Sequence, residues 1–268
     1  MKIIHRITLR TTSRIKEALR ALDVSVDDGL ATFEVDETHP SWAQIIDLAR
    51  EAKALDVIST KTTKRERRAA SWLEMNPTWH HGYPQPDDDA GYLALTYDLS
   101  NYCSVCGVGA VQDAPFRLKG EPNWGKKGIL QLNWIFDEYF ARPEVWERVF
   151  RPFGIDCCSV LDAKTDSPLA SVVQLTITAE IDVEMDAHQH EYRFCPNCER
   201  RKYLPVVRGC FPRLASNPGN VGMGKTTTFF GDGASGFRAV LVSNPLYLKL
   251  EEQAVTGASF LPVCGDAN

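Results

Sequence analysis

Two cysteine pairs carry the strongest chemical signal in this sequence. Cys103 and Cys106 stand in NYCSVCGVGA, and Cys195 and Cys198 stand in RFCPNCERRKY. Two intervening residues let both thiolates of a pair reach one metal ion from a single tight turn, and a tetrahedral zinc ion takes four such ligands. The four cysteines therefore predict one structural zinc site.

The separation of the two pairs indicates what this zinc would do. About 90 residues lie between them. Because the entropy of loop closure grows only logarithmically with length, such a distance does not forbid a shared site. A structural zinc ion contributes on the order of 10 kcal/mol, so the site is predicted to hold two distant segments together.

Three other interpretations of these residues stay open. A redox dithiol needs its first cysteine at a helix N-terminus, and neither pair precedes a helical pattern. His188 or His190, in DAHQHEYRFC, could replace one cysteine as a ligand. A catalytic zinc would keep an open coordination position, but no general base stands at motif spacing.

A second chemical signal is GNVGMGKTT, from Gly219 to Thr227, which fills every fixed position of the phosphate-loop pattern. A working phosphate loop follows a buried strand and opens a helix, whose amides hold the phosphates. Here FPRLASNP precedes it, and the β-branched, aromatic and glycine residues of TTTFFGDGASG disfavour a helix. We interpret the match as a coincidence, expect a mobile loop before an edge strand, and expect a non-enzymatic protein.

The elements that must position these residues fall into two parts. Apolar periodicity predicts strands near 3–9 and 31–35 and helices near 13–22 and 40–55, which makes residues 1–76 a small α/β unit. Residues 77–91, rich in proline, glycine and aspartate, are predicted to be a linker. Residues 92–268 form the predicted larger domain.

The larger domain has fewer regular patterns. Alternation predicts strands in YLALTYDL, ILQLNWIF, VVQLTITAEIDV, FRAVLVS and ASFLPV, and helices in RPEVWERVFRPFG and NPLYLKLEEQ. The predicted fold class is therefore α+β: a small N-terminal α/β unit and a larger mixed-sheet domain, held by a four-cysteine zinc-ribbon-like site.

Composition narrows the function further. Hydrophobic residues make up 44% and charged residues 24% of the 268, which is typical of a globular protein. A net charge of -5 makes nucleic acid an unlikely ligand and suits a basic protein partner better. No apolar run is long enough to span a membrane and no signal peptide is recognised, so we expect a cytoplasmic protein without a membrane partner.

Together with LNWIFDEYF and RAVLVSNPLYLKLEEQAVTGASFLPV, the cysteine pairs resemble the double-CxxCG-motif proteins of bacteria over roughly residues 92–264. CSVCG matches the motif fully, whereas CPNCE has Glu199 where glycine is expected. That family is counted among the immunity proteins of contact-dependent toxin cassettes. The resemblance implies a protein that binds and neutralises a cognate protein toxin inside the producing cell, with Cys103, Cys106, Cys195 and Cys198 as ligands of a structural Zn²⁺.

The alternative function is a zinc-ribbon nucleic-acid-binding or regulatory protein. Arg200, Arg201 and Lys202 directly follow the second pair and favour it, whereas the overall acidity opposes it. Under the immunity hypothesis, the acidic run Asp87 to Asp89 is a candidate contact for the toxin, although an exposed turn would look the same in sequence.

Overall fold

The computed structural model describes residues 1–265, and the chain divides into two compact units. The N-terminal unit comprises Met1–Glu66 together with Val206–Cys210, and the large unit comprises the rest of the chain. This division lies before the linker that we expected at 77–91. The reason is β4 (Trp72–Pro77), whose backbone pairs with β16 (Phe237–Ser243) and β17 (Ala258–Pro262) in a sheet of the large unit.

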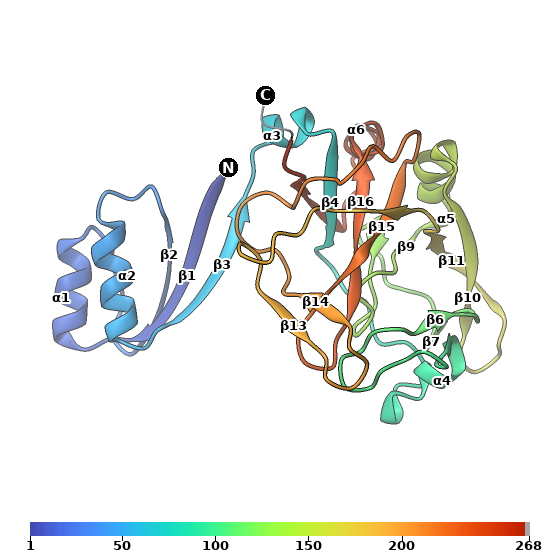
Figure 1. The fold of residues 1–268 in the computed structure, drawn as a ribbon, viewed down its shortest axis with the longest axis horizontal. Coiled ribbons are helices and arrows are strands. Elements are labelled where there is room, and N and C mark those ends of the chain that lie inside the picture. Colours follow the sequence, from blue (N-terminus) through green and yellow to red (C-terminus); the bar gives the residue numbers. More distant parts are fainter. Residues whose placement is uncertain (266–268) are drawn as a thin grey trace. The chain divides into compact units, whose positions relative to one another are not determined.

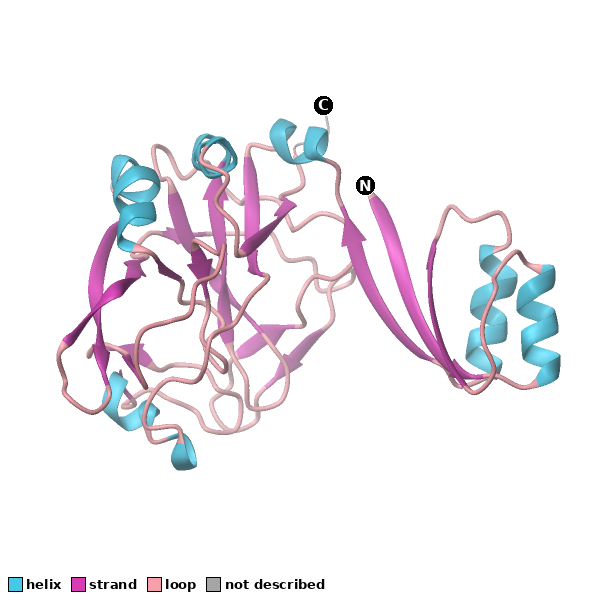
Figure 2. Cartoon of the chain, turned by 180° about the vertical axis from the view of Figure 1, so that it is seen from behind, coloured by secondary structure: helices cyan, strands magenta, loops and turns pink. Residues whose placement is uncertain are grey.

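The N-terminal unit is a three-stranded antiparallel sheet with two helices on one face, as Figures 1 and 2 show. Its elements are β1 (Lys2–Arg10), α1 (Ser13–Ala21), β2 (Leu30–Asp36), α2 (Trp42–Glu51) and β3 (Leu55–Lys61), in the sheet order β2-β1-β3. Leu19 of α1 and Ile45 of α2 are buried against Ile7 and Leu9 of β1. The predicted order strand, helix, strand, helix is confirmed, whereas β3, which begins at the end of the second predicted helix, was not predicted.

A short return segment and a buried histidine complete this unit. Thr60 Oγ1 donates to the carbonyl of Val207 at 3.0 Å and accepts from the amide of Gly209 at 2.9 Å, which fixes 206–210 to β3. His5, only 3% exposed, lies between the carboxylates of Asp56 and Glu37, at 2.8 and 3.0 Å.

The large unit contains two main sheets and a two-stranded ribbon. The larger sheet has the order β13-β14-β15-β16-β4-β17, with β12 beside β15; the second has the order β7-β10-β11-β9-β8; the ribbon is β5-β6. Their remaining strands are β5 (Tyr97–Asp98), β6 (Val111–Gln112), β7 (Arg117–Leu118), β8 (Ile129–Leu130), β9 (Phe140–Ala141), β10 (Asp156–Asp162), β11 (Pro168–Thr176), β12 (Glu180–Ile181), β13 (Tyr192–Phe194), β14 (Arg201–Tyr203) and β15 (Met223–Phe230).

Short helices connect these strands. They are α3 (Lys64–Ala69), η1 (Asp88–Ala90), α4 (Tyr92–Thr96), the continuous helical run α5 (Pro143–Val145), η2 (Trp146–Phe150) and η3 (Arg151–Phe153), and α6 (Asn244–Glu252). The main core joins both sheets to the helices: Leu73 of β4, Leu175 of β11, Phe150 of η2, Val242 of β16 and Leu246 of α6 are all fully buried. Among residues 1–265, no helix combines the length and the apolar character needed to cross a membrane.

The mixed α+β class is confirmed, but three predicted strands differ. YLALTYDL forms the helix α4 and only the two-residue strand β5. ILQLNWIF is a strand only at Ile129–Leu130, because the amide of Asn133 is bonded to the Gly82 carbonyl at 2.9 Å and the chain turns at Trp134, where φ is 70°. VVQLTITAEIDV is split between β11 and β12.

The phosphate-loop-like segment is a loop only at its start, because residues 219–222 have no regular structure and a strand begins at Met223. Met223–Phe230 is strand β15, which lies inside the larger sheet with β14 on one side and β16 on the other. The β-branched and aromatic residues that disfavour a helix here instead favour a strand. Lys225 is 5% exposed and its ammonium pairs with the Glu138 carboxylate. The next element is strand β16 rather than a helix, so the segment lacks the geometry of a phosphate loop.

Candidate metal centre

The two cysteine pairs form turns with the same backbone hydrogen bonds. In the first knuckle (103–107), which lies between β5 and β6, the Gly107 amide donates to the Cys103 carbonyl at 2.7 Å. In the second knuckle (195–199), between β13 and β14, the Glu199 amide donates to the Cys195 carbonyl at 2.9 Å. The closing residue has positive φ in both, 77° at Gly107 and 60° at Glu199.

The knuckles bring all four sulfurs to one place. Cys103 Sγ lies 3.8 Å from Cys195 Sγ, and Cys106 Sγ lies 3.5 Å from Cys198 Sγ. The four ligand atoms all lie within 4.8 Å of one another. Zinc–sulfur bonds of about 2.3 Å in a tetrahedron place the sulfurs about 3.8 Å apart. The cluster therefore has the dimensions to hold a metal ion and is compatible with zinc, and all four cysteines are free thiols.

The surroundings of the sulfurs favour metal binding. The side-chain amide of Asn197 donates to Cys103 Sγ at 3.3 Å and, with the amide of Cys106, lowers the pKa of Cys103 to about 6. The amide of Cys198 likewise lowers the pKa of Cys195. Burial raises the pKa of Cys106 to about 12. The thiolate is the form that binds a metal ion. The lowered pKa values of Cys103 and Cys195 favour this form, whereas metal binding would have to release the proton of Cys106.

Two basic residues that follow the second cysteine pair donate hydrogen bonds to backbone carbonyls in or beside the first knuckle. Lys202, 3% exposed, donates from Nζ to the carbonyls of Cys106, Gly233 and Ser235 at 2.8, 2.6 and 2.7 Å. Arg200 Nη1 donates to the Asn101 carbonyl at 2.8 Å. Lys202 and Arg200, which suggested nucleic-acid binding from the sequence, therefore stabilise the first knuckle and its flank inside the protein.

The predicted metal ligands lie together, and the predicted substitutes do not join them. Within the described range, the cluster contains the four cysteines and neither His188 nor His190. Sequence reasoning did not find Lys202 and Asn197 as supports of this centre. Lys202 lies in the short stretch RKY, which is too short for alternation to distinguish a buried lysine from an exposed one. The sequence therefore offers no usable signal for its role.

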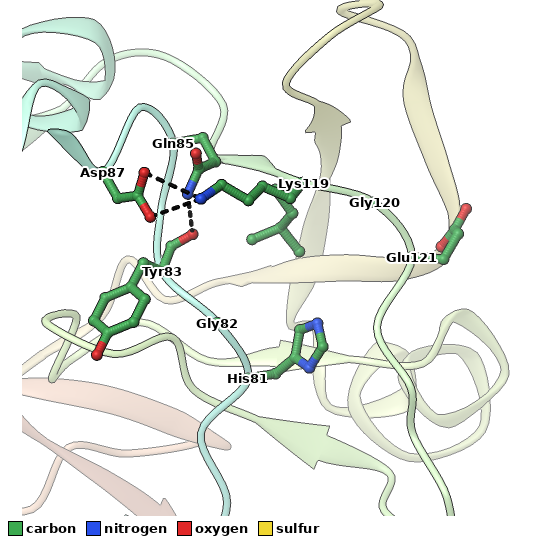
Figure 3. A pocket seen from close by; sticks show the side chains of 9 residues that line it. His81, Gly82, Tyr83, Gln85, Asp87, Lys119, Gly120 and Glu121 are labelled. Carbon is green, nitrogen blue, oxygen red and sulfur yellow. Dashed lines mark hydrogen bonds and ion pairs between the residues drawn. The ribbon is translucent and has the colours of Figure 1, made fainter.

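The start of the acidic run lines a separate hollow of 280 Å³ (Figure 3). Asp87, the first aspartate of the acidic run, pairs with Lys119 Nζ at 2.9 Å, and this bond lowers the Asp87 pKa. His81 lines the same hollow, and burial lowers its pKa. Asp87 is thus used within the chain, whereas Asp88 and Asp89 are exposed.

Comparisons with known proteins provide no relative for this arrangement. The chain matches no protein-family model, no curated protein and no solved structure.

Proposed function

We propose that this protein is a non-enzymatic, cytoplasmic immunity protein, which carries a structural zinc ion and neutralises a cognate protein toxin by binding it. One observation carries the proposal: four cysteine sulfurs, three of the residues buried and one half-buried, are arranged for a complete tetrahedral site. Such a site has no open position for a substrate or an activated water. The metal would therefore fix a surface rather than perform a reaction.

Two further features support a protein partner. The net charge of -5 favours encounter with a basic protein. The resemblance to the double-CxxCG family adds the class of partner, and Glu199 does not weaken it, because this residue adopts the same left-handed conformation as Gly107.

Nucleic-acid binding is less well supported than it was from sequence. Lys202 is buried against backbone carbonyls, and Arg200 is engaged with Asn101. Of the three basic residues only Arg201 is exposed, and its guanidinium lies 4.4 Å from the ring centroid of Tyr192. A groove for phosphates would need several free cations on one face.

The test is neutralisation in cells. The full chain would be expressed together with the toxin encoded beside its gene, and survival and co-purification would be measured. We expect rescue, a stable complex, and one zinc per chain by elemental analysis. Cells that die despite a folded, zinc-loaded protein would contradict the proposal, and a salt-sensitive shift of DNA or RNA would support the alternative.

A further inference from the structure

The large unit contains a cleft of 1150 Å³ that is separate from the hollow at His81. Its walls come from Cys158 and from four stretches that are far apart in sequence, 92–115, 134–138, 174–180 and 225–238. Its volume is at the upper end of small-molecule sites, so the cleft has room for several residues of a peptide.

The walls of the cleft carry excess negative charge. Five carboxylates and two cationic side chains line it. Glu138 pairs with Lys225, and Glu180 pairs with Arg238 at 2.8 Å. The other three carboxylates make no ion pair with any residue in 1–265. They belong to Asp113, Asp137 and Asp232.

These three carboxylates are still able to accept hydrogen bonds. Asp137 accepts from the Arg238 amide at 3.1 Å, and Asp232 accepts from the Gly233 amide at 2.8 Å. The exposed Asp113 has no side-chain partner in the described part of the chain. Because a carboxylate offers about four lone-pair sites, each can take a cationic donor without losing its present partner.

Aromatic rings surround this negative charge. Seven line the cleft: Tyr92, Tyr97, Tyr102, Trp134, Phe136, Phe229 and Phe237. Trp134 and Phe136 are 45% and 44% exposed, although residues of their size are usually buried. Aromatic faces beside carboxylates are the surroundings that bind guanidinium and ammonium groups.

Trp134 has a strained backbone conformation. Its φ of 70° is costly for a bulky residue, by about 1–3 kcal/mol. The turn persists because Asn133 bonds the Gly82 carbonyl twice, from its amide at 2.9 Å and from Nδ2 at 2.7 Å. The ring itself lies 4.4 Å from Tyr83, centroid to centroid. Strain that presents an exposed indole at the edge of a cleft is typical of a binding site.

The Lys225 ammonium, paired with the buried Glu138 carboxylate, is a hydrogen-bond donor that lines the cleft. Gln174 Nε2 donates to Glu138 Oε2 at 3.2 Å and to Gln112 Oε1 at 2.6 Å, which fixes the buried carboxylate. Within residues 1–265 the Lys225 ammonium bonds to Glu138 alone, although it carries three N–H groups. A peptide carbonyl is the kind of acceptor that the remaining N–H groups would bind.

We infer that this cleft binds an arginine-bearing segment of a protein partner, with the guanidinium between the unpaired aspartates and the rim aromatics and a backbone carbonyl toward Lys225. The inference rests on the proposed function for the identity of that partner, a protein toxin. Charge complementarity selects this occupant, since three uncompensated carboxylates repel anions and acidic segments.

The test uses the full chain and a fluorescein-labelled peptide, Gly-Arg-Leu-Gly-Arg-Leu-Gly-Arg-Gly, with fluorescence anisotropy as the readout. The matched probe replaces each arginine by citrulline, which is nearly the same shape but neutral. We expect saturable binding of the arginine peptide and affinity at least about tenfold weaker for the citrulline peptide. Equal affinity of the two peptides, or no saturable binding of either, would overturn the inference.

Variants locate the binding. Asp113→Asn and Asp137→Asn should each weaken it by about threefold or more, whereas Glu147→Gln, an equal charge change on the exposed side of η2, should not. Trp134→Gly removes the ring at a φ that glycine adopts freely, so binding should fall, and the relief of backbone strain should offset part of the packing lost against Tyr83. A Glu147→Gln variant as weak as Asp137→Asn would mean diffuse attraction and would overturn the assignment to the cleft.

The two proposals fail separately. Peptide binding without toxin neutralisation supports the cleft and contradicts the immunity function. Toxin neutralisation that is unchanged by both aspartate variants and by Trp134→Gly supports the immunity function and overturns the cleft as its contact surface.

Discussion

The two knuckles have the same backbone in different surroundings. The first is enclosed: a Cβ added to Gly107 would lie 2.1 Å from the Ala234 carbonyl oxygen. The second is on an exposed hairpin, where Tyr192, Arg193, Phe194 and Glu199 are all exposed. The left-handed closing residue is thus common to both turns, whereas the requirement for glycine comes from packing and applies only to the first.

The features that both knuckles share are those required to place two sulfurs around the proposed metal ion, and the features found only in the first knuckle are those required by its packing in the fold. Both turns must present two sulfurs, and both close with an amide-to-carbonyl bond from the fifth residue to the first. Only the first knuckle is also fixed by the Lys202 ammonium, at the Cys106 carbonyl. The second should therefore depend more on the metal for its order.

Loss of one ligand of the proposed zinc site should have the largest effect. Cys103→Ser or Cys198→Ser leaves three thiolates, and the loss, on the order of 10 kcal/mol, is comparable to the total stability of a domain. We expect less than one zinc per chain by elemental analysis and a cooperative loss of tertiary structure in the large unit by near-ultraviolet circular dichroism.

Cys157→Ser is the matched control, because Cys157 is a free, half-buried thiol outside the cluster. It should keep one zinc per chain. A Cys198→Ser variant that retains both zinc and structure would show that the second knuckle is dispensable.

Gly107→Ala should have the next largest effect. The added methyl group meets a backbone oxygen at 2.1 Å and must adopt φ near 77°. Overpacking and backbone strain together cost about 3 kcal/mol, measured as the free energy of unfolding in urea. Gly154→Ala is the control, with φ of 72° and nothing within 4 Å, and should cost about 1 kcal/mol. Equal costs would contradict the role of packing.

Lys202→Met should come third. Methionine has a similar length but leaves the carbonyls of Cys106, Gly233 and Ser235 without their donor. The three carbonyls left unsatisfied destabilise the fold, but the variant also removes the desolvation cost of a buried ammonium, so we expect a net loss of about 2 kcal/mol. Zinc should stay bound, since no ligand is lost. Arg201→Met, the exposed neighbour, should change stability by less than about 1 kcal/mol; a similar loss in both variants would argue against an internal role for Lys202.

Local periodicity explains what could be predicted from sequence. In the N-terminal unit, Ile7, Leu19 and Ile45 repeat with the period of their own strand or helix, so each element was recognisable alone. The cysteine cluster was recognisable because CxxC spacing is chemically specific, even across 92 residues. Neither inference needed knowledge of tertiary contacts.

Non-local contacts explain what could not be predicted. The turn at Trp134 depends on Gly82, and the two-residue strands of the large unit are too short to carry a period. Lys225 is buried because Glu138 lies opposite, 87 residues away in sequence. The glycines around this segment favoured a loop in the sequence, whereas the β-branched and aromatic residues of TTTFF are the local sign of strand β15.

Glu199→Gly should have the smallest effect and the opposite sign. Glu199 has φ of 60°, which costs a non-glycine residue about 1–2 kcal/mol. Glycine removes this cost, but its more flexible unfolded state cancels part of the stabilisation. We expect the free energy of unfolding to rise by about 1 kcal/mol at most. Glu199→Gln, which removes the charge and keeps the Cβ, should give no gain. If Glu199→Gly is mildly stabilising and Gly107→Ala is strongly destabilising, glycine is the better closing residue in both knuckles. The larger effect at Gly107 then measures the steric packing that only the first knuckle adds to the backbone strain common to both. If Glu199→Gly is neutral, the exposed hairpin must relax around Glu199, and the second knuckle takes its shape from the metal.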